Sequence, residues 1–469
     1  MDIGLAGGSY EDDPAVHQSS INLYPSVEEA RGRSRMVLKR TPGIEGAVVL
    51  LGNNKPCRAF FEINDQAYGV WGDQFYLWGG GGVAIPVAGA IVPGTGFDAD
   101  EGRLAVAVGD SHIVLVNDNG DVFVYTIFDG SFAQTTDVDI PAVGDVVYLD
   151  GYFIYSELAS LNTRRFYVSA LNDPFSVRAL DFATKESDSH SLVALHVSHG
   201  DLFLLGRRRT EVWRNIGNNL FPFQRIQGSE MDRGIAARDT AEEIDNTFMF
   251  VGDDLIVYRV AGYVPQRVSN HAVERHLATL GSTDRLTMFA QSYSQEGHYF
   301  YALTAGNRTF VYDATFSAQV GQQVWSERRS YPGAGPIDAV TPWRAAWIVE
   351  VYGQTYIGDS LNGSIGRLTN DETLEYGLPM RWSRTTAPIF ADADHTTLSR
   401  LEVRLEGGGN IGMEQSKDGG STWSTRKERD MASRCIWRRL GRGVDRIFRF
   451  SGTDPVTLIS GHADYEQQA

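Results

Sequence analysis

The chain has 469 residues, of which 42% are hydrophobic and 22% charged, and its net charge is −17. This composition indicates a packed core and excludes a disordered chain, and so acidic a body is not expected to wrap DNA, because it repels phosphate. The 50 glycines, 23 phenylalanines and 20 tyrosines, without an apolar run long enough to span a bilayer, favour short strands joined by tight turns.

The first segment, residues 1–48, differs from everything after it, and we expect an extended arm without a secretory signal. Residues 21–24 alternate apolar and polar side chains before Pro25, which is typical of an edge strand, and Tyr24 is expected to be buried. A basic run follows and is expected to face a partner. It supplies three candidate interface residues: Arg31, Arg33 and Arg35.

Residues 49–378 repeat one pattern about seven times, in which β-like runs are separated by tight turns. Asn-Gly, Asp-Gly and Gly-Asp pairs occupy many of these turns, and such residues tolerate the positive φ that hairpins need. The second turn of each copy recurs roughly every 41 to 57 residues, the period of a β-propeller blade rather than of a sandwich. We predict an all-β propeller of about seven units, or six blades if the first or last copy is not a blade.

Helical signals are sparse, and residues 270–280 are expected to form a short helix with Asn270 as its N-cap. The repeat pattern ends near Pro379. Six further β-like runs then predict a C-terminal β-sandwich-like domain over residues 379–469.

Basic residues are concentrated in two stretches of an otherwise acidic chain. Residues 426–449 carry nine basic and three acidic side chains, a net charge of +6, and residues 20–46 carry +2. The rest of the chain therefore carries −25. Nucleic acid and acidic protein surfaces both fit such basic stretches. With a turn of three arginines, the chain supplies five more candidate interface residues: Arg207, Arg208, Arg438, Arg439 and Arg442.

Motifs of nucleotide, zinc-protease and serine-hydrolase sites are missing from the sequence. His190, His196 and His199 lie near one strand and are interpreted as ordinary histidines rather than metal ligands, while Cys57 and Cys435 are expected to stay free thiols. No catalytic, cofactor-binding or metal-binding residue is assigned. Four acidic pairs are interpreted as solvated turns rather than general acids and bases: Asp12-Asp13, Glu28-Glu29, Glu242-Glu243 and Asp253-Asp254.

Residues 416–423, SKDGGSTW, fit the Asp-box pattern S-x-D-x-G-x-T-W. This motif resembles the repeats of sialidase propellers, so a glycosidase or polysaccharide depolymerase is a legitimate alternative function. The motif occurs once, outside the repeats, and no acid pair for glycoside chemistry can be placed beside it. The simpler interpretation is a hairpin whose turn is capped by Asp418, with Trp423 packed beneath it.

Short motifs follow one another over nearly the whole chain. These are Asn22, Tyr24 and Pro25, then Thr41-Pro42-Gly43-Ile44, GIAA at 234–237, VYDA at 311–314 ahead of Trp325, WRRLGR at 437–442, RF at 449–450 and PVTL at 455–458. Their order, in a chain of this length, resembles the packaged-DNA-stabilisation, or tail-nozzle, proteins of short-tailed bacteriophages.

The resemblance implies a structural virion protein of the tail, assembled in the host cytoplasm, without enzymatic activity or cofactor. It implies a ring of several copies, typically six, below the portal and its adaptor, which continues the DNA channel, retains the packaged genome and holds a needle or plug and tail fibres or spikes. DNA would pass without specific binding along an acidic wall. A host-type propeller scaffold outside any virion is a further alternative.

Overall fold

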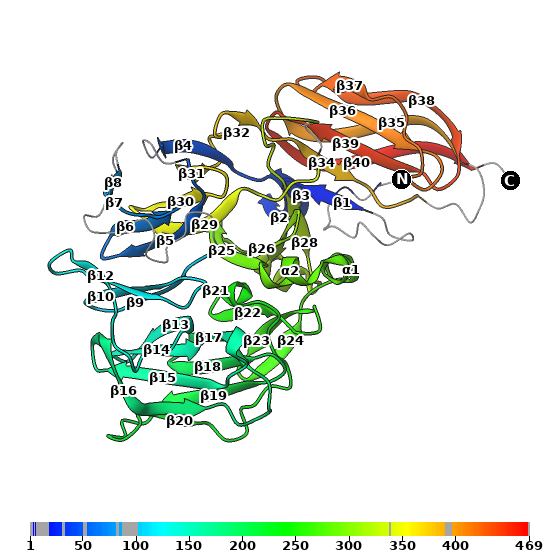
Figure 1. The fold of residues 1–469 in the computed structure, drawn as a ribbon. Helices are drawn as coiled ribbons and strands as arrows, with labels where there is room; N and C mark the ends of the chain where they lie inside the picture. Colours follow the sequence, from blue (N-terminus) through cyan, green and yellow to red (C-terminus); the bar gives the residue numbers. More distant parts are fainter. Residues whose placement is uncertain are drawn as a thin grey trace.

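The computed structural model describes residues 3, 5, 18–30, 33–49, 54–80, 84–86, 102–336, 339–389 and 396–467. Two all-β bodies make up the molecule, a propeller and a sandwich that lies against one side of it (Figure 1). The predicted fold class is confirmed, and the described residues form seven blades rather than six.

Each blade is a four-stranded antiparallel sheet whose first strand lies innermost. Tight turns with positive φ, such as Asp150-Gly151, join the strands as the sequence predicts. The first four blades comprise β5 (Cys57–Ile63), β6 (Gln66–Trp71), β7 (Gln74–Trp78) and β8 (Ala84–Pro86); β9 (Ala105–Val108), β10 (His112–Val116), β11 (Val122–Thr126) and β12 (Phe132–Gln134); β13 (Val143–Leu149), β14 (Tyr152–Glu157), β15 (Arg165–Ala170) and β16 (Asp173–Thr184); and β17 (Leu192–Ser198), β18 (Asp201–Gly206), β19 (Thr210–Asn215) and β20 (Phe223–Arg225).

The last three blades follow the same plan, except that the seventh takes its outer strand from the start of the chain. They comprise β21 (Glu242–Ile244), β22 (Thr247–Val251), β23 (Val257–Ala261) and β24 (Val264–Arg267); β25 (Phe289–Gln295), β26 (His298–Ala305), β27 (Arg308–Asp313) and β28 (Trp325–Arg328); and β29 (Ala345–Val351), β30 (Gln354–Asp359), β31 (Ser364–Thr369) and β4 (Gly43–Val49). Two short strands, β32 (Leu374–Glu375) and β33 (Leu378–Pro379), extend the seventh sheet beyond β4.

Apolar side chains fill the space between every pair of neighbouring blades. A separate buried cluster lies at each of the seven junctions, including the one between the seventh and first blades, where Trp71 and Trp78 pack against β29 and β30. The ring of blades is therefore closed by hydrophobic packing as well as by β4.

Helices occur only in connections within the described chain. The predicted helix is confirmed as α1 (His271–Thr279), whose N-cap Asn270 accepts a hydrogen bond from the Val273 backbone N–H. The others are α2 (Ser282–Leu286), α3 (Ala314–Val320) and two 3₁₀ turns, η1 (Ala159–Leu161) and η2 (Arg238–Thr240).

The sandwich is built from both ends of the chain. One sheet has the order β2 (Leu23–Ala30), β3 (Arg33–Arg40), β40 (Val456–Gln467), β35 (Thr396–Gly407) and β38 (Cys435–Gly443). The other has the order β1 (Ser19–Ile21), β34 (Trp382–Thr385), β39 (Ile447–Gly452), β36 (Asn410–Ser416) and β37 (Lys427–Asp430), and it continues through β28 into the sixth blade. Trp382, Trp437 and Phe450 are fully buried in the core between them.

The expected arm therefore contributes to both bodies: β1–β3 belong to the sandwich and β4 belongs to the propeller. Tyr24 is buried as predicted, and its hydroxyl donates to Glu296 at 3.0 Å. Domain boundaries after residues 48 and 378 stay a prediction.

Candidate interaction surfaces

The turns that join the first and second strands of the blades share one face of the propeller, which we call the turn face. Five of the seven turns contain an acidic residue, and none of them contains a lysine or arginine. The turns span residues 64–65, 109–111, 150–151, 199–200, 245–246, 296–297 and 352–353.

Hydrogen bonds connect the ends of neighbouring blades along the turn face. The Tyr148 hydroxyl donates to Asp110 at 3.2 Å, and Asn215 donates to Asp150 at 3.1 Å. The Tyr263 hydroxyl donates to Asp201 at 2.8 Å. The acidic turns of blades two and three, and Asp201 at the start of β18 in blade four, are thus each bonded to the next blade.

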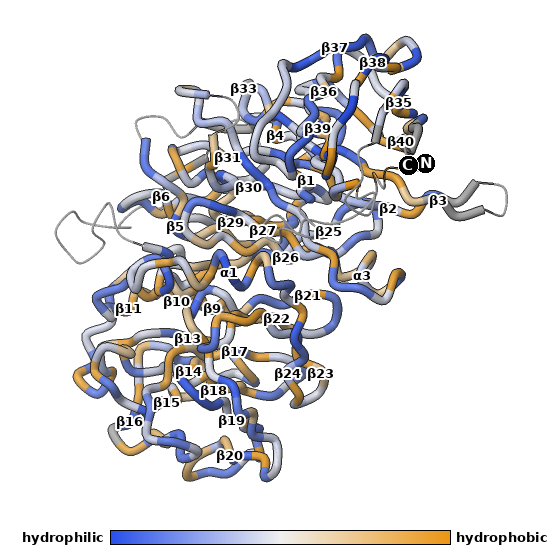
Figure 2. Tube along the Cα trace, turned by 90° about the vertical axis from the view of Figure 1, so that its right-hand side faces the viewer, coloured by the Kyte–Doolittle hydropathy of each residue, from blue (hydrophilic) through white to orange (hydrophobic). Residues whose placement is uncertain are grey.

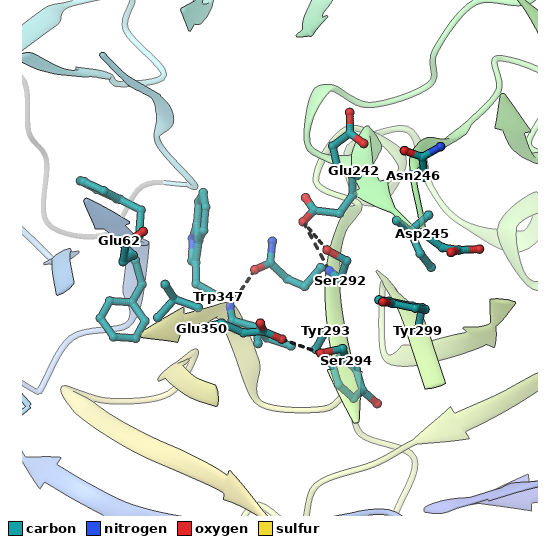
Figure 3. A pocket seen from close by; sticks show the side chains of 17 residues that line it. Glu62, Glu242, Asp245, Asn246, Ser292, Tyr293, Ser294, Tyr299, Trp347 and Glu350 are labelled. Carbon is teal, nitrogen blue, oxygen red and sulfur yellow. Dashed lines mark hydrogen bonds between the residues drawn. The ribbon is translucent and has the colours of Figure 1, made fainter. Parts of the chain in front are cut away.

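A cavity of about 550 Å³ lies on this face, between the inner strands β5, β21, β25 and β29 (Figure 3). Among the described residues its lining contains no lysine or arginine, although Arg259 pairs with the lining residue Asp245 at 2.9 Å. Five carboxylates line it, and aromatic rings supply much of the remaining wall. The carboxylates belong to Glu62, Glu242, Glu243, Asp245 and Glu350, and the rings to Phe60, Phe61, Tyr293, Tyr299 and Trp347.

Glu242 is the most enclosed of the cavity carboxylates. Its Oε1 accepts hydrogen bonds from the Ser292 hydroxyl at 3.1 Å and the Ser292 backbone N–H at 3.4 Å. Burial outweighs these bonds and raises the pKa of Glu242 to about 7. Glu350 accepts from the Ser294 hydroxyl at 2.8 Å, so serine hydroxyls hold both carboxylates in place.

Two arginines cross the centre of the propeller from another side. Arg103 lies between two aromatic rings, with its guanidinium 4.0 Å from the Trp347 ring centroid and 4.5 Å from that of Phe289, and it donates to the Ala346 carbonyl. Burial lowers the pKa of Arg103 to about 10. Arg238 donates to the carbonyls of Gly144 and Arg103 at 2.9 Å each. These contacts tie together the inner parts of several blades.

The arginines of the basic stretch, residues 426–449, are of two kinds: some have partners within the sandwich, and others have no ion pair among the described residues. Arg434 pairs with Glu402 at 2.7 Å, Arg449 lies 3.8 Å above the Trp423 ring, and Arg446 is buried. Three exposed arginines of β38 have no ion pair among the described residues: Arg438, Arg439 and Arg442. They lie on an open edge, because β38 is the outermost strand of its sheet.

A β-bulge changes the direction of these side chains. Leu398 and Arg400 on β35 pair with Gly441 and Arg438, so two residues of β38 oppose one of β35. Arg439 occupies the bulge with a φ of 57°, and consecutive Arg438 and Arg439 are both exposed. A regular strand would have directed one of them inward.

The other predicted interface residues are not brought together with those of β38. Arg207 and Arg208 lie in the turn between β18 and β19, on the face opposite the turn face, and Figure 1 places these strands far from β38. Arg208 is exposed and lies 3.8 Å from Asp253. Arg31 lies outside the described residues, and only the backbone of Arg33 and Arg35, on β3, is described.

The turn interpretation of the acidic pairs holds for Asp253-Asp254 only. Glu28-Glu29 and Glu242-Glu243 lie on strands β2 and β21, and Asp12-Asp13 lies outside the described residues. Sequence reasoning therefore missed the cavity, although an acid in five of seven corresponding turns was a visible signal.

The Asp-box forms a local hairpin between β36 and β37. Asp418 accepts hydrogen bonds from the Ser416 hydroxyl at 2.7 Å and the Thr422 backbone N–H at 2.9 Å. These bonds, with the Thr422 hydroxyl, lower the pKa of Asp418 to about 2. All of these partners belong to the turn itself, which supports the predicted structural role.

Both cysteines are buried free thiols, as expected. Over the described parts of the chain, no group of three or more His, Cys, Asp or Glu is arranged to hold a metal ion. The same residues include no helix with the length and hydrophobicity of a membrane span.

No curated protein matches this sequence. Among solved structures, the extracellular domain of a one-component system from B. thetaiotaomicron is similar at 10% identity, over 76% of this chain and 43% of that chain, with a TM-score of 0.44. The computationally designed Ika8 protein is similar at 12% identity, over 69% and 99%, with a TM-score of 0.39. PorZ, a component of the type-IX secretion system of Porphyromonas gingivalis, is similar at 12% identity, over 81% and 46%, with a TM-score of 0.38. The chain spans less than half of the two natural proteins, and such distant similarities say nothing about function.

The family described as "Bacteriophage P22 Gp10, beta-propeller" matches residues 1–373. The match includes β1–β4 and all seven blades, the part of the chain that carries the N-terminal motifs. The resemblance drawn from the sequence is confirmed, and the chain belongs to this phage-stabilisation, tail-nozzle family.

Proposed function

We propose that the protein forms the tail-nozzle ring below the portal and its adaptor, retains the packaged genome and continues the channel for its ejection. The observation that carries this proposal is the family match over residues 1–373, which makes a structural role in a bacteriophage the starting point. The proposed ring contains several copies, typically six, belongs to the virion tail and is assembled in the host cytoplasm. Its other partners are a needle or plug and tail fibres or spikes.

In this proposal the genome passes between copies and not through a propeller. Arg103 and Arg238 tie the inner strands across the propeller centre. The channel wall is formed by acidic surface, which the net charge of −17 supports. Such a wall repels phosphate and so lets the DNA pass without specific binding. A channel lined mainly by arginine and lysine would contradict this part of the proposal.

Electron microscopy of the purified protein, alone and with a portal-adaptor assembly, tests the proposal. We expect closed rings with cyclic symmetry that bind the adaptor end of the portal. Particles produced without the protein should lose their packaged DNA. A protein that neither forms rings nor binds the assembly would overturn the proposal and favour a scaffold outside the virion.

The alternative of a propeller glycosidase or depolymerase rests on the Asp-box alone. The Asp418 carboxylate is bound within its own turn, where it stabilises a hairpin of the sandwich. Release of sugars from sialosides or host polysaccharide by the purified protein would support the enzyme instead.

A further inference from the structure

We propose that the acidic cavity of the turn face receives Arg438 and Arg439 from the β38 edge of a neighbouring copy. This inference rests on the proposed ring and assigns the contact that closes it. The partner is a second copy of this chain, and its two surfaces are different parts of the molecule.

The cavity has the chemistry of a guanidinium site. Five carboxylates line it, and none of the residues in its lining is a cation. Trp347 and Tyr299 offer ring faces or edges beside Glu350 and Asp245 (Figure 3). Carboxylates bind guanidinium through paired hydrogen bonds, and aromatic faces attract the same planar cation.

The rim of the cavity is exposed and already ordered. Glu62, Asp245 and Glu350 are exposed, while Ser292 and Ser294 hold the Glu242 and Glu350 carboxylates. His196 lies 3.3 Å from Glu243, and Arg103 lies behind Trp347. Asp245 is already paired with Arg259 at 2.9 Å, so the rim carboxylates that an incoming arginine meets without an ion pair among the described residues are Glu62 and Glu350.

The β38 edge supplies arginines that form no ion pair within the described part of the chain. Residues 426–449 contain six basic residues besides Arg438, Arg439 and Arg442. Among these six, Arg434 and Arg449 are engaged within the sandwich. The bulge at Arg439 turns two consecutive arginines outward, at the cost of a non-glycine residue with positive φ. Such a local cost is expected where the exposed side chains have a binding role.

The contact joins different copies because the two surfaces lie apart within one chain. Figure 1 places β38 at the outer end of the sandwich, whereas the cavity lies between β5, β21, β25 and β29 of the propeller. A ring with cyclic symmetry requires two different complementary faces on each copy. The acidic turn face and the basic edge have opposite charge and meet this requirement.

Charge reversal tests the inference by native mass spectrometry and electron microscopy. The edge variant carries Arg438→Glu and Arg439→Glu, and the cavity variant carries Glu62→Lys and Glu350→Lys. Each variant alone should raise the dissociation constant of the assembly at least tenfold. A chain with all four substitutions should assemble again. Mixing the two variants should also restore rings, in which they alternate.

A matched control reverses the same charge elsewhere. Arg207 and Arg208 are also candidate interface residues, but they lie on the opposite face, so Arg207→Glu with Arg208→Glu should leave this contact intact. Loss of rings in this variant would assign the two arginines to a second interface. Thermal unfolding checks that every variant folds, and Arg438→Gln with Arg439→Gln provides a milder version of the edge variant with an intermediate loss.

The outcomes separate this inference from the ring itself. If the natural chain forms rings and the edge variant does so equally well, the inference is wrong and the ring stands. If both variants fail and the fourfold variant is not restored, the arginines act elsewhere and the inference is again wrong. Unchanged rings that lose packaged DNA would assign the arginines to DNA, and absence of rings in the natural chain would overturn the proposed function.

Discussion

Asn22 connects three parts of the molecule through one buried side chain. Its Nδ2 donates to the carbonyls of Arg329 at 2.9 Å and Arg381 at 2.7 Å, and its Oδ1 accepts from the Arg329 backbone N–H at 3.0 Å. Its φ of 53° suits asparagine better than most residues. The N-terminal motif noticed in the sequence therefore marks the point where arm, propeller and sandwich meet.

Asn22→Ala should destabilise the protein by about 2–4 kcal/mol, because three buried hydrogen bonds are lost and their partners are left unsatisfied. Asn64→Ala is the matched control, since Asn64 has a φ of 51° in an exposed turn. Chemical unfolding of both variants measures the difference. Equal losses would show that backbone conformation, not the buried bonds, sets the effect.

Asp145 gives a second prediction at the level of a residue. Its Oδ2 accepts from the Leu195 backbone N–H at 2.7 Å, between blades three and four, and burial raises its pKa to about 7. The neutral form is favoured in the folded state, so stability present at pH 4 is lost as pH rises towards 7. Asp145→Asn removes this loss, which amounts to about 4 kcal/mol at 1.36 kcal/mol per pKa unit.

Scanning calorimetry should therefore show the Asp145→Asn protein gaining stability over the natural chain between pH 4 and pH 7, with a constant difference above that. The amide oxygen still accepts from the Leu195 backbone N–H, whereas the amide NH2 replaces the oxygen that accepts from Val146 at 2.9 Å, a loss that does not depend on pH. A difference in Tm that stays constant over this range would contradict the prediction.

At the level of elements, β4 is the strand on which propeller closure depends. It pairs with β31 over Gly43–Val49 and seats Ile44, fully buried, between blades six and seven. The structure explains the glycine of the motif Thr41-Pro42-Gly43-Ile44. A Cβ on Gly43 would stand 2.5 Å from the carbonyl oxygens of Glu372 and Leu374, so only glycine fits.

Ile44→Ala should cost about 2–5 kcal/mol, because it leaves a cavity at the closure of the ring. Glu45→Ala alters the neighbouring residue, whose exposed ion pair with Arg367 should contribute no more than about 1 kcal/mol. Hydrogen exchange of β31 amides should quicken in the first variant and change little in the second. Equal protection in both would contradict a closing role for β4.

The sequence predicted the elements whose signals are local. Alternating runs and turn residues located the hairpins, and Asn270 located α1. It did not show that residues 43–49 complete the seventh blade, because their partner β31 lies more than 300 residues away. Strand β37 was missed because Lys427–Asp430 is wholly charged and exposed, without alternation. The cavity was missed because its acids come from three separate blades, the first, fifth and seventh.

At the level of the whole molecule, hydrophobic residues follow the usual division between interior and surface, whereas charged residues are unevenly distributed over the surface. Apolar segments line the interior of both bodies and polar residues occur all over the outside (Figure 2). Charge is asymmetric instead, with acidic turns on one propeller face and unpaired arginines on a distant sandwich edge. This asymmetry gives each copy two ends of opposite sign.

Assembly should therefore weaken with salt. The Debye length falls from about 10 Å at 0.1 M to about 3 Å at 1 M, which screens attraction between exposed charges. Sedimentation of the natural chain over this range should show rings giving way to smaller species, and the Arg438→Gln, Arg439→Gln protein should show a flatter dependence. Salt-independent rings would indicate an interface held by apolar contacts.

Strands β1–β4 also set an order of events during synthesis. They are synthesised before their partners, so β4 must wait for β31, and the hairpin of β2 and β3 must wait for β40 near residue 460. At roughly 5–20 residues per second, this delay lasts on the order of tens of seconds. A ribosome that stalls before the last strands releases a chain whose sandwich cannot close. The split pairing thus makes closure of the sandwich depend on the last strand to be synthesised, because an unfinished chain leaves β3 and β35 without β40 between them.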